Sequence, residues 1–164
     1  MNTKNSFSYW AAKDAKILIL GTMPGEESLA HAEYYAHARN AFWPIMFELF
    51  GGSLENASYK DKKNLILSNS IALWDVLRSC EREGSLDSDI RNMIPNDINS
   101  FLCGHPTVKA VFFNGKAAEK FYNKFFERLP GVKYFSLPST SPANAQLNYA
   151  QKLALWADAF KKVF

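Results

Sequence analysis

Two asparagines and a hydroxyl-rich loop are the residues of this chain whose types best suit a chemical role. Asn40 stands directly before an apolar run, Asn114 ends another, and Ser139-Thr140-Ser141 lie between two prolines. An amide is neither a useful acid nor a base near pH 7, so it acts by aligning a reactant and by hydrogen bonding. Hydroxyl groups suit contacts to phosphate or sugar. These residues indicate a site that works through positioning and polar stabilisation.

The same residues also have ordinary structural explanations. Asn40 is a good helix N-cap, Asn114 with the following glycine makes a good loop, and the segment 139–141 suits a cap. Asp75 is likewise placed to cap a helix that follows it, and this role fits it better than catalysis. Residue type alone therefore leaves the catalytic and the structural interpretations open.

The elements that must position these residues follow from the apolar pattern. Short apolar runs predict strands at 17–20, 71–74, 108–113 and 132–137, and helical spacing predicts helices at 42–50, 117–126 and from 148 onward. A short helix is expected at 97–102, a surface helix or loop at 53–64, and an exposed excursion at 81–96. Strands that alternate with helices favour an α/β fold of three layers, α/β/α, around a central four-stranded, mainly parallel sheet.

In such a sheet, the loops that follow the strands meet at one edge, where ligands bind. Three polar loops are expected there, at 21–25, 114–116 and 139–144. They offer glycine for close backbone approach, together with amides and hydroxyls. The first loop, Gly21-Thr22-Met23-Pro24-Gly25, lacks the spacing of a phosphate-binding or dinucleotide-binding loop. Nucleotide cofactors are therefore not expected.

Composition sets the outer bounds of the prediction. The 164 residues, 48% of them hydrophobic, can bury one sizeable core, so we expect a single domain over residues 1–164. The net charge of +3 permits an anionic partner, and the aromatic share of 15% offers rings that could stack on bases. No stretch approaches the ~20 apolar residues of a membrane span. We expect a cytoplasmic monomer with no membrane partner.

Metal and redox chemistry have little support in the sequence. Cys80 and Cys103 are too few for a four-cysteine zinc or iron–sulfur site, and their spacing is unlike that of a redox pair. His31, His37 and His105 lack metal-ligand spacing. We therefore expect no cofactor and no metal.

Three segments in this order resemble the uracil-DNA glycosylase superfamily, and within it the hypoxanthine-DNA (deoxyinosine) glycosylase branch. They are the loop at 21–25, the stretch Tyr-Tyr-Ala-His-Ala-Arg-Asn-Ala-Phe-Trp at 34–43, and Leu-Pro-Ser-Thr-Ser-Pro-Ala at 137–143. The resemblance extends from about residue 17 to residue 156. It implies a four-stranded parallel sheet and a mechanism in which the target nucleotide is flipped out of the duplex.

Departures from the superfamily pattern narrow the choice. The loop position that carries Asp in the uracil-specific enzymes, or Asn in the mismatch-specific ones, is Met23 here, and a thioether cannot position water. The His-Ser-Pro signature of the uracil enzymes is absent as well, because Pro138 precedes Ser139. The resemblance assigns the vacant catalytic task to Asn40 and a second polar role, in base binding or catalysis, to Asn114.

The remaining roles can be assigned to the expected loops. Asn40 would align the attacking water or donate to the leaving base, and Phe42 would stack on the flipped base, although Phe42 could equally be a core residue. Main-chain groups of the first loop would read the polar edge of the base. The base-binding set is Gly21, Thr22, Met23, Pro24 and Phe42, and the DNA-binding set is Arg39, Lys116, Ser139, Thr140 and Ser141.

The predicted function is therefore that of a monofunctional DNA glycosylase of base excision repair, acting on double-stranded DNA that contains a deaminated base, with hypoxanthine as the preferred target. Another glycosylase specificity, for uracil or a mismatched pyrimidine, is an alternative, because pocket size cannot be read from the sequence. A non-catalytic nucleic-acid or nucleotide-binding module on the same frame is an alternative of another class.

Overall fold

A four-stranded parallel sheet forms the centre of the molecule. The computed structural model describes residues 3–164. The strands are β2 (Ile17–Gly21), β3 (Ile71–Asp75), β6 (Ala110–Asn114) and β7 (Lys133–Leu137). They lie in the order β3-β2-β6-β7, and every neighbouring pair is parallel. The predicted α/β class and four-stranded sheet are confirmed.

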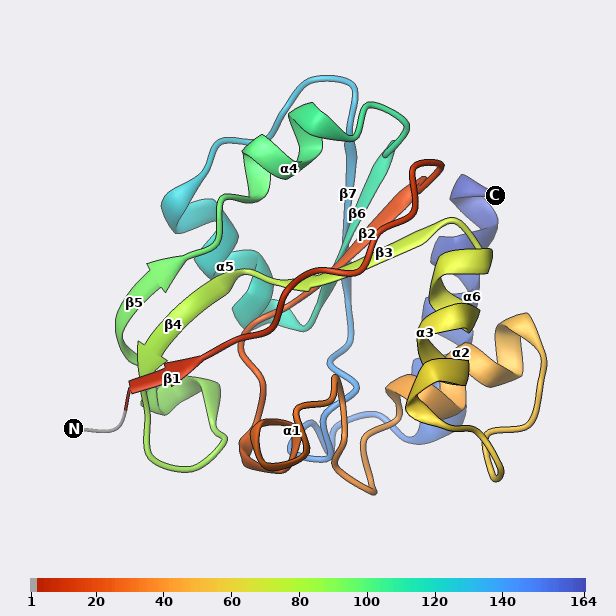
Figure 1. Ribbon diagram of the computed structural model, residues 1–164, viewed down its shortest axis with the longest axis horizontal. Coiled ribbons are helices and arrows are strands. Elements are labelled where there is room, and N and C mark those ends of the chain that lie inside the picture. Colours follow the sequence, from red (N-terminus) through yellow and green to blue (C-terminus); the bar gives the residue numbers. More distant parts are fainter. Residues whose placement is uncertain (1–2) are drawn as a thin grey trace.

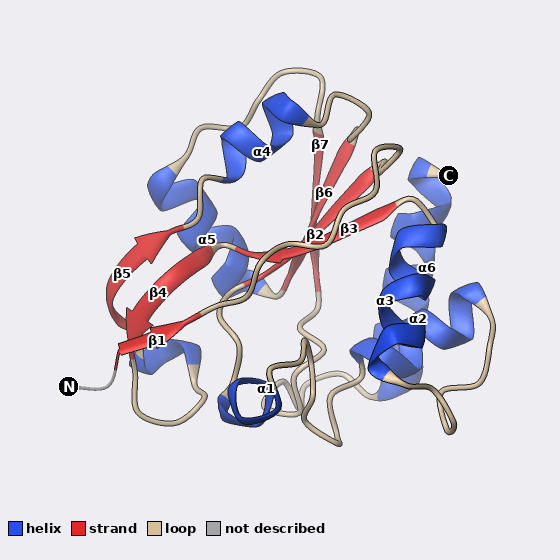
Figure 2. Cartoon of the chain, in the orientation of Figure 1, coloured by secondary structure: helices blue, strands red, loops and turns tan. Residues whose placement is uncertain are grey.

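Helices cover both faces of this sheet, which gives the three expected layers (Figures 1 and 2). One face packs against α2 (Phe42–Phe50), α3 (Tyr59–Ser68) and α6 (Tyr149–Val163). The other face packs against α4 (Ile98–Gly104) and α5 (Lys116–Phe125). The short helix α1 (Glu26–His31) follows β2 and lies beyond the carboxyl ends of the strands.

The two-sided core explains why β2 reads as an unbroken apolar run. Successive side chains of a strand point to opposite faces. Ile17 and Ile19 belong to the core under α2, α3 and α6, whereas Leu18 and Leu20 belong to the core under α4 and α5. All four side chains are fully buried. A strand covered on both faces needs apolar residues at every position.

A second, antiparallel sheet was not predicted from the sequence. It consists of β1 (Thr3–Asn5), β4 (Leu77–Glu81) and β5 (Arg91–Pro95), in the order β1-β4-β5. The stretch 81–96 was expected to be an exposed excursion; residues 91–95 are indeed exposed or half-buried, but they form the strand β5, which was not expected. The 3-10 turn η1 (Asp87–Asp89) connects β4 and β5. The mixed polar composition of these short strands conceals their alternation.

The prediction that Asp75 caps a helix is wrong. Asp75 is the last residue of β3, and the chain continues in an extended form into β4. The backbone N–H groups of Val76 and Leu77 donate to the carbonyls of Gly21 and Thr22, at 2.8 and 3.1 Å. These bonds hold the chain across the end of β2, so no helix can begin there. Among residues 3–164, no helix is long and apolar enough to cross a membrane.

Candidate active site

The strand order creates a crevice at the carboxyl end of the sheet. From β2 the chain first passes to β3 on one side and later returns to β6 on the other side, so the loops after β2 and β6 diverge. Open α/β sheets bind ligands at such a switch point. A cavity of about 380 Å³ lies there, which falls in the ~300–1,000 Å³ range of small-molecule sites.

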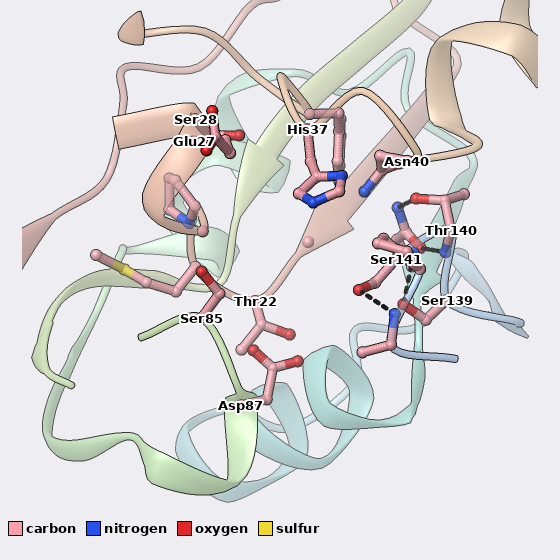
Figure 3. Close-up of a pocket in the computed structure, with 18 of the residues that line it drawn as sticks. Thr22, Glu27, Ser28, His37, Asn40, Ser85, Asp87, Ser139, Thr140 and Ser141 are labelled. Carbon is pink, nitrogen blue, oxygen red and sulfur yellow. Dashed lines mark hydrogen bonds between the residues drawn. The ribbon is translucent and has the colours of Figure 1, made fainter. Parts of the chain in front are cut away.

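Most of the residues selected from the sequence line this one cavity. They come from all three expected loops and from the segment before α2: Gly21, Thr22, Met23, Pro24, Asn40, Asn114, Ser139, Thr140 and Ser141. Figure 3 shows Asn40 and the segment Ser139–Ser141 on one side of the cavity, with Thr22 and Asp87 on another. Segments that are more than a hundred residues apart in the sequence thus face a common space.

Three predicted site residues lie outside the cavity. Phe42, expected to stack on a base, is fully buried at the start of α2, where its helix face packs against the sheet. Tyr35 lies against it, with ring centroids 4.1 Å apart and an interplanar angle of 23°, and Tyr35 lines the cavity instead. Arg39 and Lys116 are exposed and do not contribute to the cavity wall.

Asn40 is held so that its amide nitrogen is left for a ligand. Its Oδ1 accepts a hydrogen bond from the backbone N–H of Phe42 at 2.9 Å, which satisfies one of the free donors at the start of α2. The Asn40 backbone N–H donates to the carbonyl of His37 at 2.9 Å. Because Oδ1 faces the helix, Nδ2 points away from it, toward the cavity (Figure 3). The N-cap of α2 is Ala41, so Asn40 is not the cap itself but supports the helix start through this one bond, which is compatible with a catalytic role.

Asn114 ties the end of β6 to the loop that follows β7. Its Nδ2 donates to Thr140 Oγ1 at 3.0 Å, and its Oδ1 accepts from the Thr140 backbone N–H at 2.9 Å. Both residues are buried, with 7% and 1% of their surface exposed. The Thr140 carbonyl in turn accepts from the N–H of Ala41, beside Asn40, at 2.9 Å. We call Asn40, Asn114 and Thr140 the amide wall of the pocket.

Helix α6 fixes the loop of the amide wall from behind. The indole N–H of Trp156 donates to the carbonyl of Pro138 at 3.0 Å, and Lys152 Nζ donates to the carbonyl of Ser141 at 3.2 Å. Lys152 is only 5% exposed, and burial lowers the pKa of its ammonium group. Sequence reasoning missed Lys152, because its place on an apparently exposed helix gives no sign of burial.

Glycine is required at position 21, where three parts of the pocket come together. A Cβ on this residue would clash with Asp75 Oδ1 and would lie 2.7 Å from the Tyr35 hydroxyl oxygen. Tyr35 itself has a positive φ of 53°, a conformation that costs a bulky residue free energy and is found mainly at functional sites. Both Tyr35 and Asp75 therefore approach the backbone of the first loop closely.

Opposite the amide wall lies a cluster of ionisable groups, which we call the acid wall: Asp75 and Asp87, which line the cavity, and Arg82, which does not. The Arg82 side chain is buried; Nη2 donates to the carbonyl of Pro24, and Nη1 lies 3.9 Å from Asp87 Oδ1. Asp75 Oδ2 is buried and has no hydrogen-bond partner. Burial and the neighbouring Asp87 raise the pKa of Asp75 to about 7, although Arg82 acts in the opposite direction.

The other acid-wall and aromatic groups respond to the same environment. Burial raises the pKa of Asp87, while Arg82 and the Thr22 hydroxyl partly offset this effect. Burial, followed by the charge of Asp75, raises the pKa of Tyr35 well above its ordinary value. The side chain of Asn114, which is within hydrogen-bonding reach of the buried Tyr35 hydroxyl, partly offsets this rise, although no well-formed hydrogen bond is made. Among residues 3–164, no three His, Cys, Asp or Glu side chains are grouped to hold a metal ion.

Sequence reasoning missed Asp75 and Tyr35, which line the pocket, and Arg82, which lies outside its lining, as functional candidates. A usable signal existed for Asp75, because it directly follows a predicted strand, as Asn114 does, and both residues end the observed strands. Tyr35 was part of the segment that carried the family resemblance, but its neighbour Phe42 was preferred for stacking. Arg82 lies in a polar stretch that gives no indication of a buried cation.

Comparisons with known proteins agree with this fold. A family model, the uracil DNA glycosylase superfamily, matches residues 7–160. Two curated relatives are named hypoxanthine DNA glycosylase. The relative from Methanosarcina barkeri is 32% identical, covering 97% of this chain and 99% of its own length; that from Methanosarcina acetivorans is 33% identical, covering 88% and 90%.

A solved structure provides an independent comparison. The solution NMR structure of a candidate uracil DNA glycosylase from Methanosarcina acetivorans superimposes with a TM-score of 0.77 and 29% sequence identity, covering 96% of this chain and 98% of that one. The fold and these relatives define the class of protein as an α/β DNA glycosylase. The chain belongs to the uracil DNA glycosylase superfamily.

Proposed function

We propose that this protein excises hypoxanthine from double-stranded DNA by hydrolysing the N-glycosidic bond of a flipped deoxyinosine. The observation that carries the proposal is the held amide of Asn40, whose Oδ1 is engaged by α2 while Nδ2 is left toward the pocket. The names of the two curated relatives support the choice of base. Met23, at the position of the catalytic Asp or Asn in other branches, supports a distinct mechanism.

Asn40 acts in this proposal as a fixed hydrogen-bond donor. The glycosidic bond breaks toward an oxocarbenium-like sugar, and electron density moves onto the departing base. A preorganised donor aimed at that developing charge stabilises the transition state without reorganisation, typically by a factor of about 10²–10³. Asn114 positions the loop of Thr140 through two hydrogen bonds, and its side chain also lines the pocket.

The first loop reads the base. The carbonyls of Gly21 and Thr22 already accept hydrogen bonds from the backbone N–H groups of Val76 and Leu77. We therefore assign the backbone N–H groups of Thr22 and Met23 to the polar edge of the base. Tyr35, stacked on Phe42, replaces Phe42 as the aromatic wall of the pocket. These contacts suit a planar heterocycle that carries hydrogen-bond acceptors at its edge.

DNA itself is held around the rim. Ser139 and Ser141 belong to the anchored loop, and their hydroxyls suit the phosphate and sugar next to the flipped nucleotide. Arg39 and Lys116 are exposed, so they are assigned to phosphates outside the pocket rather than to the base. Opening the duplex costs a few kcal/mol and is cheapest at a mismatch, which favours inosine paired with thymine.

A panel of duplexes tests the substrate. Each duplex carries one deoxyinosine, deoxyuridine or deoxyxanthosine opposite either thymine or guanine, and the released free base is quantified by chromatography under single-turnover conditions. The expected result is fastest release of hypoxanthine. Faster release of uracil would replace the proposed specificity with that of the uracil enzymes. Binding of damaged duplexes without release of any base would instead establish a non-catalytic binding module.

A further inference from the structure

The acid wall contains a carboxyl group whose surroundings suit a proton donor. Asp75 lies at the end of β3, directly beside Gly21 at the end of β2, and it lines the cavity. Its residue is only 3% exposed, with Oδ1 over the Cα of Gly21 and Oδ2 without a partner. A buried carboxylate without donors is strongly disfavoured, so this environment holds the group as a neutral acid.

The nearby cation does not neutralise Asp75. Arg82 directs Nη2 to the Pro24 carbonyl and Nη1 toward Asp87, and it forms no ion pair with Asp75. Asp87 approaches from η1 and adds a like charge, whereas Tyr34 and Tyr35 face Asp75 from the segment before α2. His37 lines the cavity as well. The pKa of about 7 for Asp75 reflects burial first and Asp87 second.

We propose that Asp75 is the general acid that protonates a ring nitrogen of the departing purine. This inference rests on the proposed function. A purine attached to deoxyribose has unprotonated ring nitrogens at N3 and N7, whereas uracil attached through N1 has none, because its N3 carries a proton. An acid in the pocket thus assists a purine and offers no ring protonation to uracil, which makes Asp75 a determinant of specificity.

The step balances as follows. The carboxyl O–H of Asp75 gives its proton to N7 or N3 while the bond from C1′ to N9 breaks and its electron pair passes to the ring, so the base leaves as neutral hypoxanthine. Water then forms a bond to C1′ of the oxocarbenium sugar. The proton released by that water passes to the Asp75 carboxylate or to solvent, which restores the acid.

The test combines Asp75→Asn with substrates that lack one ring nitrogen. Single-turnover excision is measured from pH 5.5 to 9 on duplexes that contain deoxyinosine, 7-deaza-deoxyinosine or 3-deaza-deoxyinosine. The wild-type rate on deoxyinosine should fall about tenfold per unit above the pKa of the acid, and Asp75→Asn should lower the rate below pH 7 by about 10²–10⁴-fold and flatten the profile. For the deaza substrate that lacks the ring nitrogen protonated by Asp75, wild type and Asp75→Asn should excise the base at the same rate.

Two measurements keep the result interpretable. DNA binding and circular dichroism at each pH separate loss of acid catalysis from loss of structure, and the wild-type pH profile is informative even if the variant fails to fold. A wild-type rate that does not change between pH 6 and 9, or equal rates for wild type and Asp75→Asn, would overturn the role of Asp75 while leaving hypoxanthine excision intact. Absence of hypoxanthine release by wild type would refute the proposed function itself.

Discussion

The amide wall and the acid wall enclose one pocket but are built on opposite principles. In the amide wall, Asn114 and Thr140 satisfy each other, and the Asn40 oxygen is used by α2. In the acid wall, Asp75 Oδ2 and two nitrogens of Arg82 are buried without hydrogen-bond partners, although one of these nitrogens lies 3.9 Å from Asp87 Oδ1. Unsatisfied buried polar atoms cost free energy and are rare. The amide wall is therefore fixed by its own hydrogen bonds, whereas the acid wall keeps hydrogen-bonding groups that a substrate can satisfy.

The largest effect expected from this contrast is on the pH dependence of stability. The pKa of Asp75 rises from its ordinary ~3.9 in the unfolded chain to about 7 in the folded protein. Its stabilising contribution is thus fully present below pH 4 and is lost as the pH rises through 7. At about 1.4 kcal/mol per unit, the unfolding free energy of wild type should fall relative to Asp75→Asn by up to about 4 kcal/mol between pH 4 and 9.

Urea denaturation of both proteins across this pH range checks the prediction. Asp75→Asn is the reference for wild type, because Asp87, whose pKa is also raised, contributes to the pH dependence of both proteins. A difference in unfolding free energy that stays constant with pH would show that Asp75 is ionised in the folded protein at neutral pH.

A smaller loss of unfolding free energy is expected when the hydrogen bonds of the amide wall are removed. Asn114→Ala removes both partners of Thr140, whose N–H and hydroxyl are then left buried. Unsatisfied buried groups cost about 1–3 kcal/mol each, so we expect a loss of about 3 kcal/mol in the free energy of unfolding, together with slower excision. Chemical denaturation measures the first effect, and single-turnover assays measure the second.

Asn56→Ala is the matched control for this variant, since Asn56 is exposed and does not line the pocket. It should leave stability and excision unchanged. If Asn114→Ala were as stable as this control, the pairing of Asn114 with Thr140 would not hold the loop in solution.

The smallest expected change in unfolding free energy is a gain, and it comes from the substitution of Tyr35. The Tyr35 hydroxyl is buried beside the Asn114 amide without a well-formed hydrogen bond, so Tyr35→Phe removes a poorly satisfied group while keeping the ring against Phe42. We expect a gain of about 1 kcal/mol in unfolding free energy and weaker binding of deoxyinosine DNA. Thermal unfolding and fluorescence anisotropy provide the two measurements. A loss of stability would mean that the hydroxyl has a partner in the free protein.

Much of the fold was predictable because it depends on local apolar patterns. Strands β2, β3 and β6 contain short uninterrupted apolar runs, whereas Lys133 and Ser136 interrupt β7. The stripe on α5 and the Asn148 cap of α6 mark their helices directly. The sheet β1-β4-β5 was not predictable in this way. In β4 and β5, exposed residues such as Arg78 and Ile94 do not follow a strict alternation, and two register irregularities interrupt their pairing.

The site was predictable where its residues follow strands or carry the family resemblance. Asn40, Asn114 and the segment 139–141 meet in the pocket because parallel strands bring their carboxyl ends to one edge. The choice between Phe42 and Tyr35 could not be made from residue type, since both are aromatic and only packing decides which is buried. Asp75 was misassigned because a helix was expected after it.

The central claim is that the side-chain amide of Asn40 acts as a hydrogen-bond donor in catalysis, and one pair of variants tests it most directly. Asn40→Asp keeps an oxygen for the Phe42 N–H but removes the amide donor, whereas Asn40→Ala removes both. Single-turnover release of hypoxanthine at saturating enzyme should fall by about 10²–10³-fold in both variants, with only Asn40→Ala losing about 1 kcal/mol of stability. Wild-type excision by Asn40→Asp would contradict the account and place the chemistry on the oxygen.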